Sequence, residues 1–158
     1  MNFLSTLLNL FGTKSGRDMK ELSPIIDSVS RHTSIVSSLS NNELRRKTSE
    51  FKSKIHNISD SFDEKINKLK ELVKKQENRD DQEDLYKKID DLNNEKYVEI
   101  SKKLDDIKSE AFAVIKETAQ RFNNEESIQV TATDLDIKLS QRTDYVTINK
   151  KEAFWKSC

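Results

Sequence analysis

SFDEKINKLKELVKK, residues 61–75, is the stretch of sequence that decides the fold of this chain. Most of its residues are polar or charged, but four apolar ones recur at steps of four, three and four: Phe62, Ile66, Leu69 and Val73. Apolar residues at this spacing form a stripe along one side of an α-helix, and the seven-residue repeat is typical of a coiled coil. The stretch therefore predicts a long helix that buries one narrow face.

A second helical series follows a polar break at residues 76–81. Two helices of opposite direction joined by this break predict an antiparallel coiled-coil hairpin over residues 59–109, with a first arm of about 25–30 Å. The five-residue step from Leu92 to Tyr97 breaks the heptad and predicts a local irregularity. The apolar positions expected in the second arm are Leu85, Ile89, Leu92, Tyr97, Ile100, Leu104 and Ile107.

Residues 17–58 predict further helix before the hairpin. Ser40 and Glu43 have the spacing of a capping box, in which each side chain bonds the other residue's free amide, and a helix should run from there to about Ile55. Pro24 should kink the preceding helix or restart it with Ser23 as the cap. The side chains expected inward on that helix are Met19, Leu22, Ile26 and Val29, with Ile35 and Val36 as further candidates.

The opening segment, residues 1–16, predicts an amphipathic helix of about three turns that ends at Gly12. One interpretation is a helix docked on its own protein or on a partner. The other is reversible membrane attachment, with apolar side chains in the headgroup boundary and basic ones on anionic lipid. The candidate membrane or translocon contacts are Phe3, Leu4, Leu7, Leu8, Phe11, Lys14, Arg17 and Lys20.

Downstream of the hairpin, residues 110–123 predict a continuing helix that Asn123 and Asn124 should stop. The spacing then changes to strict alternation, which predicts two short strands at 128–132 and 145–148, separated by one or two helical turns at 134–139. Phe154 and Trp155 stand close to the last residue, so the extension over residues 124–158 is expected to be incomplete.

The composition favours a mainly α fold of elongated helices with a short β element near the C-terminus. Hydrophobic residues make up 34% and charged residues 35%, with only two glycines and one proline; charged residues ordinarily make up roughly 25%. Such a chain can form narrow helical seams more readily than a thick core. A basic excess over residues 1–58 suits an anionic membrane surface, whereas the acidic excess over residues 59–110 argues against nucleic-acid binding.

The residues offer no catalytic, cofactor-binding or metal-binding site. The nearest approach to a phosphate-binding loop is residues 12–16, where the glycine spacing is short and the lysine and hydroxyl pair is absent, so a flexible cap and turn is expected there. His32 and His56 lack partners at metal-ligand spacing. Cys158 is the only cysteine, which excludes an internal disulfide and fits a reduced, cytoplasmic setting. The opening segment fits neither a cleaved signal nor a membrane-spanning helix.

Four blocks in order resemble the N-terminus of SecA, the ATP-driven motor of bacterial preprotein translocation. They are the apolar opening that ends at Phe11-Gly12, a charged run from Arg17, the stretch LSNNELRRKTSEF at residues 39–51, and EAFAVIKETAQRF at residues 110–122. The resemblance covers residues 1–56 and 110–122, and the hairpin between them looks like an insertion. Bacteroidetes-type forms of SecA are similar, with a helical insert, a strand like Val130–Asp134 and a tryptophan near position 155.

The resemblance implies that residues 17–56 and 110–122 pack on a first nucleotide-binding domain. It implies contact of the first helix with acidic phospholipids, the SecYEG channel and a second SecA copy, at the cytoplasmic side of the inner membrane. ATP and magnesium would serve the full-length protein in exporting preproteins, with ATP-binding residues beyond Cys158, so this segment alone is expected to be inactive. A freestanding coiled-coil tether or scaffold without enzymatic activity is the alternative, and a decayed remnant a third hypothesis.

Overall fold

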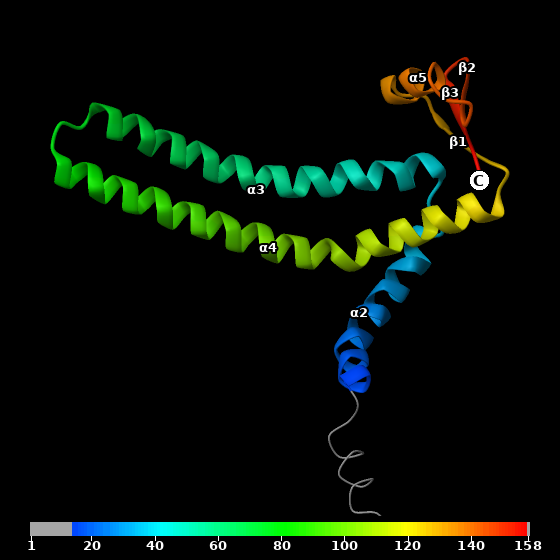
Figure 1. Ribbon diagram of the computed structural model, residues 1–158, viewed down its shortest axis with the longest axis horizontal. Coiled ribbons are helices and arrows are strands. Elements are labelled where there is room, and N and C mark those ends of the chain that lie inside the picture. The colour runs from blue at the N-terminus through cyan, green and yellow to red at the C-terminus, as the bar shows by residue number, and fades with distance from the viewer. Residues whose placement is uncertain (1–13, 158) are drawn as a thin grey trace, which may run out of the picture. The chain divides into compact units, whose positions relative to one another are not determined.

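The computed structural model describes residues 14–157, with side chains from residue 18 onward, and it is mainly helical (Figure 1). The predicted helical fold class, with a small β element near the C-terminus, is confirmed. The predicted helix over residues 1–11 and its end at Gly12 lie outside the described residues. The elements, in order, are α2 (Lys14–Val36), α3 (Asn41–Lys75), α4 (Arg79–Asn124), β1 (Ser127–Thr131), α5 (Asp134–Ser140), β2 (Val146–Asn149) and β3 (Glu152–Lys156).

The chain divides into two compact units, and α3 and α4 each run through both. The hairpin unit is Arg45–Ala111, and the terminal unit combines Met1–Leu44 with Phe112–Cys158. The helix expected to end near Ile55 continues to Lys75, because apolar residues recur past Ile55 at Ile58 and Phe62 without a glycine or proline to stop it. The segment boundaries predicted at residues 58 and 109 fall inside helices and stay predictions.

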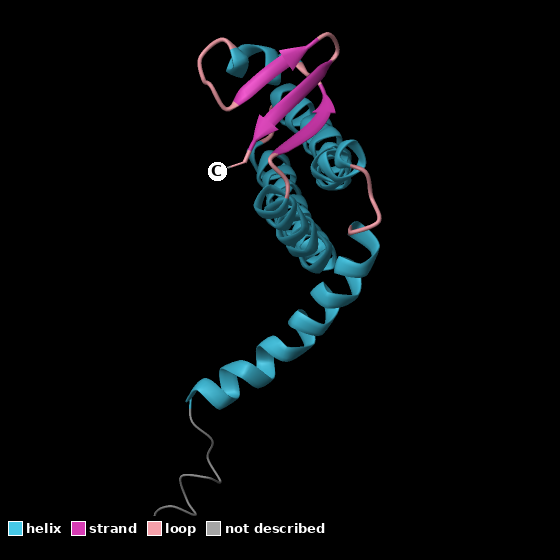
Figure 2. Cartoon of the chain, turned by 90° about the vertical axis from the view of Figure 1, so that its right-hand side faces the viewer, coloured by secondary structure: helices cyan, strands magenta, loops and turns pink. Residues whose placement is uncertain are grey.

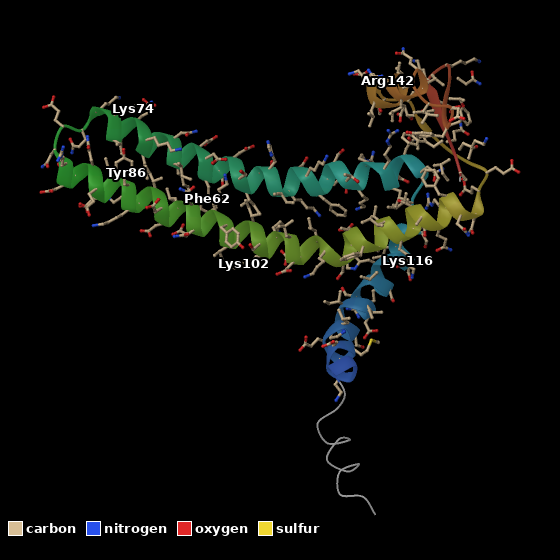
Figure 3. The ribbon with its side chains drawn as sticks, in the orientation of Figure 1. Phe62, Lys74, Tyr86, Lys102, Lys116 and Arg142 are labelled. Atoms are coloured by element: carbon tan, nitrogen blue, oxygen red, sulfur yellow. The ribbon has the colours of Figure 1, made fainter. Side chains whose placement is uncertain are left out.

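The hairpin unit is built on one apolar seam between α3 and α4, which run in opposite directions from a short turn at residues 76–78 (Figure 1). Ile66, Val73 and Ile89 are buried in it. Phe62, labelled in Figure 3, lies between the arms, whereas Lys74 and Lys102 project from their outer sides. The predicted hairpin, its turn and the first four apolar positions are confirmed. The partly buried members of the seam are Phe62, Leu69, Leu85 and Leu92.

The seam continues past Leu92 through Lys96, and this corrects the predicted irregularity. Tyr97 is 74% exposed, and α4 is unbroken from Arg79 to Asn124. Lys96 keeps the four-residue step from Leu92, and its ammonium donates to both carboxylate oxygens of Asp63 on α3, at 2.7 and 2.8 Å. Leu104 is also exposed, whereas Ile107 is buried as expected. A lysine in a seam fixes the register of two helices at some cost in stability.

Two ion pairs between described residues link the arms, and each shifts the pKa of one of its members. The hydrogen bond from Lys96, and then the one from Ser59, lowers the pKa of Asp63. Because this pKa is lower in the folded hairpin, the stabilisation is present above about pH 4 and is lost as the pH falls through the folded value. Lys47 bonds Glu110 at 2.9 Å, and this bond, followed by the one to Glu50, raises the pKa of Lys47.

We expect Lys96→Leu to raise the melting temperature of the hairpin. The leucine would extend the apolar seam, and Asp63, which is half exposed, can be solvated once its partner is gone. Thermal unfolding followed by far-ultraviolet circular dichroism measures the change. Lys96→Ala is the matched control and should melt below the wild type, because it removes the ion pair without adding apolar contact. A leucine variant that melts with the alanine variant would contradict a seam position for residue 96.

α2 is continuous across Pro24, which excludes the restart at Ser23, one of the two predicted outcomes. A proline removes one hydrogen bond at its own nitrogen and strains one turn, and the helix on both sides retains its other bonds. Residues 14–16 also belong to α2, so the flexible turn predicted over residues 12–16 is wrong for these three positions. The capping box is confirmed, because the Ser40 amide donates to Glu43 at 2.8 Å and the Glu43 amide donates to the Ser40 hydroxyl at 3.3 Å.

The C-terminal part forms a three-stranded antiparallel sheet in the order β1-β3-β2, shown in magenta in Figure 2. The two predicted strands and the helical turns between them are confirmed to within two residues. The central strand β3 was not predicted. Its Ala153 is fully buried and pairs with Val130 of β1 and Ile148 of β2. The turn into β3 places Lys150 in the left-handed region, at φ 55°, so β2 and β3 form a tight hairpin.

Candidate functional site

The predicted membrane or translocon contacts fall largely outside the structure. Phe3, Leu4, Leu7, Leu8 and Phe11 precede the described residues. Lys14 and Arg17 lie in the first turns of α2, described there by their backbone alone, and Lys20 is exposed on the same helix. The structure therefore leaves this set of contacts as a prediction.

α2 carries an apolar stripe that the described part of the chain leaves open. Met19, Leu22 and Ile26 follow at steps of three and four, and their exposed fractions are 55%, 48% and 50%. These side chains were predicted to point inward, and among the residues that the structure describes that prediction is wrong. An amphipathic pattern shows that a helix face suits an apolar surface, but it does not show that the same chain provides that surface. At the end of α2, Val36 is buried and Ile35 is 63% exposed.

α4 carries a second open stripe inside the terminal unit. Phe112 and Ile115 are 54% and 63% exposed, and Ala119, one turn further, lies on the same side of the helix. The three residues are three and four positions apart and so share one face. Val114, which lies between Phe112 and Ile115 in the sequence, is buried on the other side of the helix.

The opposite face of α4 is held in place by Arg121. Its Nε donates to Glu117 at 2.8 Å, one Nη donates to the Asn41 side chain at 2.7 Å, and the other donates to the Leu39 carbonyl at 2.7 Å. The Arg121 and Glu117 side chains are only 13% and 10% exposed. The guanidinium thus ties α4 to the segment between α2 and α3, and this fixes which side of α4 faces outward.

Asn41 and Asn42 extend this network to the sheet. Asn41 donates to the Gln129 carbonyl at 3.3 Å, and the Asn42 side chain accepts from the Thr131 amide at 2.8 Å. The first turn of α3 therefore holds β1 beside it. The pattern Glu117-x-x-x-Arg121 in an apolar helix could have suggested an ion pair from the sequence. Its bonds to residues about eighty positions earlier could not be read there.

A third group of hydrogen bonds, around the Asp136 side chain, joins α5 to the sheet. The Asp136 side chain is fully buried and accepts from the Thr133 amide at 2.7 Å, the Thr133 hydroxyl at 2.8 Å and the Trp155 indole at 3.1 Å. The carboxylate thus caps α5 and anchors the central strand. Trp155 also lies against Tyr145, with ring centroids 6.2 Å apart. These hydrogen bonds therefore hold the parts of the terminal unit together, and the unit exposes two apolar stripes, one on α2 and one on α4.

The two histidines lie apart from any metal-binding arrangement. His32 is hydrogen-bonded through Nδ1 to the Ser28 carbonyl, 2.9 Å away on the same helix. His56 is exposed and lies 3.9 Å from Asp60. Over residues 14–157, no group of three or more histidine, cysteine or acidic residues is placed to hold a metal ion. Within the same residues, the helices are too polar or too short to cross a membrane.

The comparisons with known proteins agree with one another. The family model of the SecA DEAD-like domain matches residues 7–133. The chain is 38% identical over 158 residues to the protein translocase subunit SecA of Christiangramia forsetii, and 41% identical over 156 residues to that of Flavobacterium psychrophilum. These alignments cover 99% and 98% of the chain but only 14% of each relative. No solved structure matches the chain.

Proposed function

The chain belongs to the SecA family and corresponds to its N-terminal region, and on that premise we propose that its open stripes dock on the remainder of a SecA subunit. The observation that supports this most is the stripe of Phe112, Ile115 and Ala119. Large apolar side chains at helical spacing on one exposed face suit a protein surface better than water. The proposed role is that of a scaffold segment, which completes the subunit without carrying out its chemistry.

The activity itself belongs to the complete subunit. We propose that a SecA containing this segment couples ATP hydrolysis, with magnesium, to the export of preproteins through the SecYEG channel. The relatives are named as protein translocase subunits, which supports this proposal. They give no support to a freestanding coiled-coil tether. ATP-binding residues would come from the parts of the relatives that this chain does not span.

Contact with the membrane is a separate part of the proposal. We propose that the opening segment attaches peripherally, from the cytoplasm, to acidic phospholipids, the channel or a second SecA copy. The apolar residues among the first eleven, followed by Lys14, Arg17 and Lys20, support it by their composition. An apolar face with basic neighbours binds anionic bilayers through burial of its apolar side chains and through electrostatic attraction of its basic side chains to the lipid. A Leu7→Asp/Leu8→Asp variant should float less with anionic vesicles, because two charges enter the apolar face. Unchanged flotation would contradict the attachment.

The docking proposal predicts a large effect of Phe112→Lys/Ile115→Lys in a complete subunit. The suitable protein is a chimera in which this chain replaces the matching segment of the Flavobacterium psychrophilum SecA. We expect its preprotein-stimulated ATPase to fall at least tenfold, because two charges would be buried against an apolar surface. The isolated chain with the same substitutions should keep its stability to within about 0.5 kcal/mol, since both side chains already face water.

Tyr97→Lys is the matched control, because Tyr97 is a large exposed side chain of the hairpin unit, outside the two stripes. It should leave both the chimera and the isolated chain unchanged. A chimera that retains full activity while carrying both F112K and I115K would contradict the docking proposal. So would a double variant that unfolds the isolated chain, because these side chains would then be packed inside it.

A further inference from the structure

The outer side of α3 in the hairpin unit carries a regular pattern of exposed side chains. They line a shallow groove on the helix face opposite the seam residues, and Leu72, its one apolar lining residue, is 51% exposed. None of the groove residues belongs to the apolar seam between α3 and α4, although Leu72 and Lys75, at one end of the groove, also border a hollow shared with α4. Lys74, which neighbours the groove, projects on this outer side of α3 in Figure 3. The residues that line the groove are Glu64, Asn67, Lys68, Glu71, Leu72 and Lys75.

The charges along this groove alternate in sign. The series is therefore complementary to a second copy of itself that runs in the opposite direction. Reading from one end, they are negative, positive, negative and positive, at Glu64, Lys68, Glu71 and Lys75. If two copies of α3 meet face to face and antiparallel, with the two-fold axis between residues 69 and 70, Glu64 of each copy lies opposite Lys75 of the other. The same operation brings Lys68 opposite Glu71. A parallel arrangement would instead place identical charges opposite one another.

Leu72 fits the same arrangement. The two-fold places it opposite Asn67 of the other copy, beside the aliphatic stems of the lysines, which can cover apolar surface while their charges stay in water. Among the described residues, Glu64, Lys68 and Lys75 make no ion pair, and only Glu71 is engaged, with Lys74 at 2.7 Å. Three of the four charges are therefore available to a second copy without breaking an existing pair.

We propose that this groove, which we call the outer α3 face, is a self-association surface on which two copies of the chain pair antiparallel through their hairpins. The pairing is isologous, so each contact occurs twice. Its contacts are mostly exposed ion pairs around one leucine on each side, so the association is concentration-dependent and weakens as salt is added. It uses the hairpin alone and is independent of the docking of the terminal unit.

Zero-length carbodiimide cross-linking of the full 158-residue chain tests this arrangement directly. In one copy, Glu64 and Lys75 are separated by eleven residues of helix, about 16 Å, which is beyond the reach of a direct amide link. A Glu64–Lys75 link can therefore form only between copies. We expect this link in a mixture of unlabelled and ¹⁵N-labelled chains, with both isotopes in the cross-linked peptide. If links between copies are absent or are confined to other residues, the proposal is overturned.

A charge exchange supplies a second, independent measurement. Glu64→Lys places lysine opposite lysine at both symmetry-related contacts, and we expect the dissociation constant from sedimentation equilibrium to rise about tenfold. Lys75→Glu should have a similar effect. The double variant Glu64→Lys/Lys75→Glu restores opposite charges and should return to within about threefold of the wild type. A double variant as weak as the singles, with helical content unchanged, would overturn the antiparallel pairing.

Discussion

Arg121→Ala is expected to lower the free energy of unfolding of the terminal unit by about 3 kcal/mol, the lower end of the range for a broken buried ion pair. The substitution removes the bonds by which this side chain holds α4 to Asn41 at the start of α3 and to the Ser37 and Leu39 carbonyls before it. It also leaves the Glu117 carboxylate, 10% exposed, without its partner. Trp155 is the only tryptophan and lies in this unit, so urea unfolding followed by its fluorescence reports the change.

Two matched variants test whether the effect depends on the geometry and burial of the Arg121 side chain or only on its charge. Arg121→Lys keeps the charge but not the planar fork, so it should recover only part of the loss. Arg46→Ala removes an arginine that is 66% exposed and 3.6 Å from Glu50, and its effect should stay within about 0.5 kcal/mol. If Arg121→Ala unfolds at the same urea concentration as Arg46→Ala, the network around Arg121 does not hold the unit together.

Asp136→Ala should have an effect of similar size, about 3 kcal/mol, through a different mechanism. The carboxylate is fully buried, and its removal leaves the Thr133 amide and the Trp155 indole without their acceptor. Both bonds are part-buried, so each donor left unsatisfied should cost about 1 kcal/mol, the lower end of the range, and the lost helix cap should cost about 1 kcal/mol more. The loss should appear as earlier unfolding of the sheet, followed both by Trp155 fluorescence and by its near-ultraviolet circular dichroism.

Asp134→Ala is the control for this prediction. Asp134 is an exposed acidic residue in the first turn of the same short helix, so its removal tests the helix-end charge without the buried contacts. Its cost should be below about 1 kcal/mol. Asp136→Asn keeps the size of the side chain but replaces one acceptor oxygen with a donor, so it should lie between the two. Equal effects of Asp134→Ala and Asp136→Ala would show that the buried contacts contribute little.

The parts of the fold that could be predicted are those set by local periodicity. The four-three-four steps of Phe62, Ile66, Leu69 and Val73 specify a helix face, and alternation around Val130 specifies a strand. The capping box at Ser40 involves residues three apart and could be identified for the same reason. In each case, the residues that determine the structure lie within a few positions of one another.

Other features depend on contacts that periodicity does not show. A lysine is expected on the surface, so the pattern does not single out Lys96, whose seam position depends on Asp63 in the opposite arm. β3 is hard to predict because adjacent Phe154 and Trp155 conceal its alternation. For α2 and α4, the pattern correctly identifies apolar stripes, but which partner covers Met19 or Phe112 depends on surfaces outside the stripe itself.

Hydroxyl-radical footprinting of Met19, Leu22, Phe112 and Ile115, in the isolated chain and in the SecA chimera, tests the docking account most directly. All four side chains are about half exposed or more in this structure. If both stripes dock on the remainder of the subunit, all four side chains should be oxidised rapidly in the isolated chain and at least tenfold more slowly in the chimera. Side chains already protected in the isolated chain, or equally reactive in the chimera, would contradict the docking account.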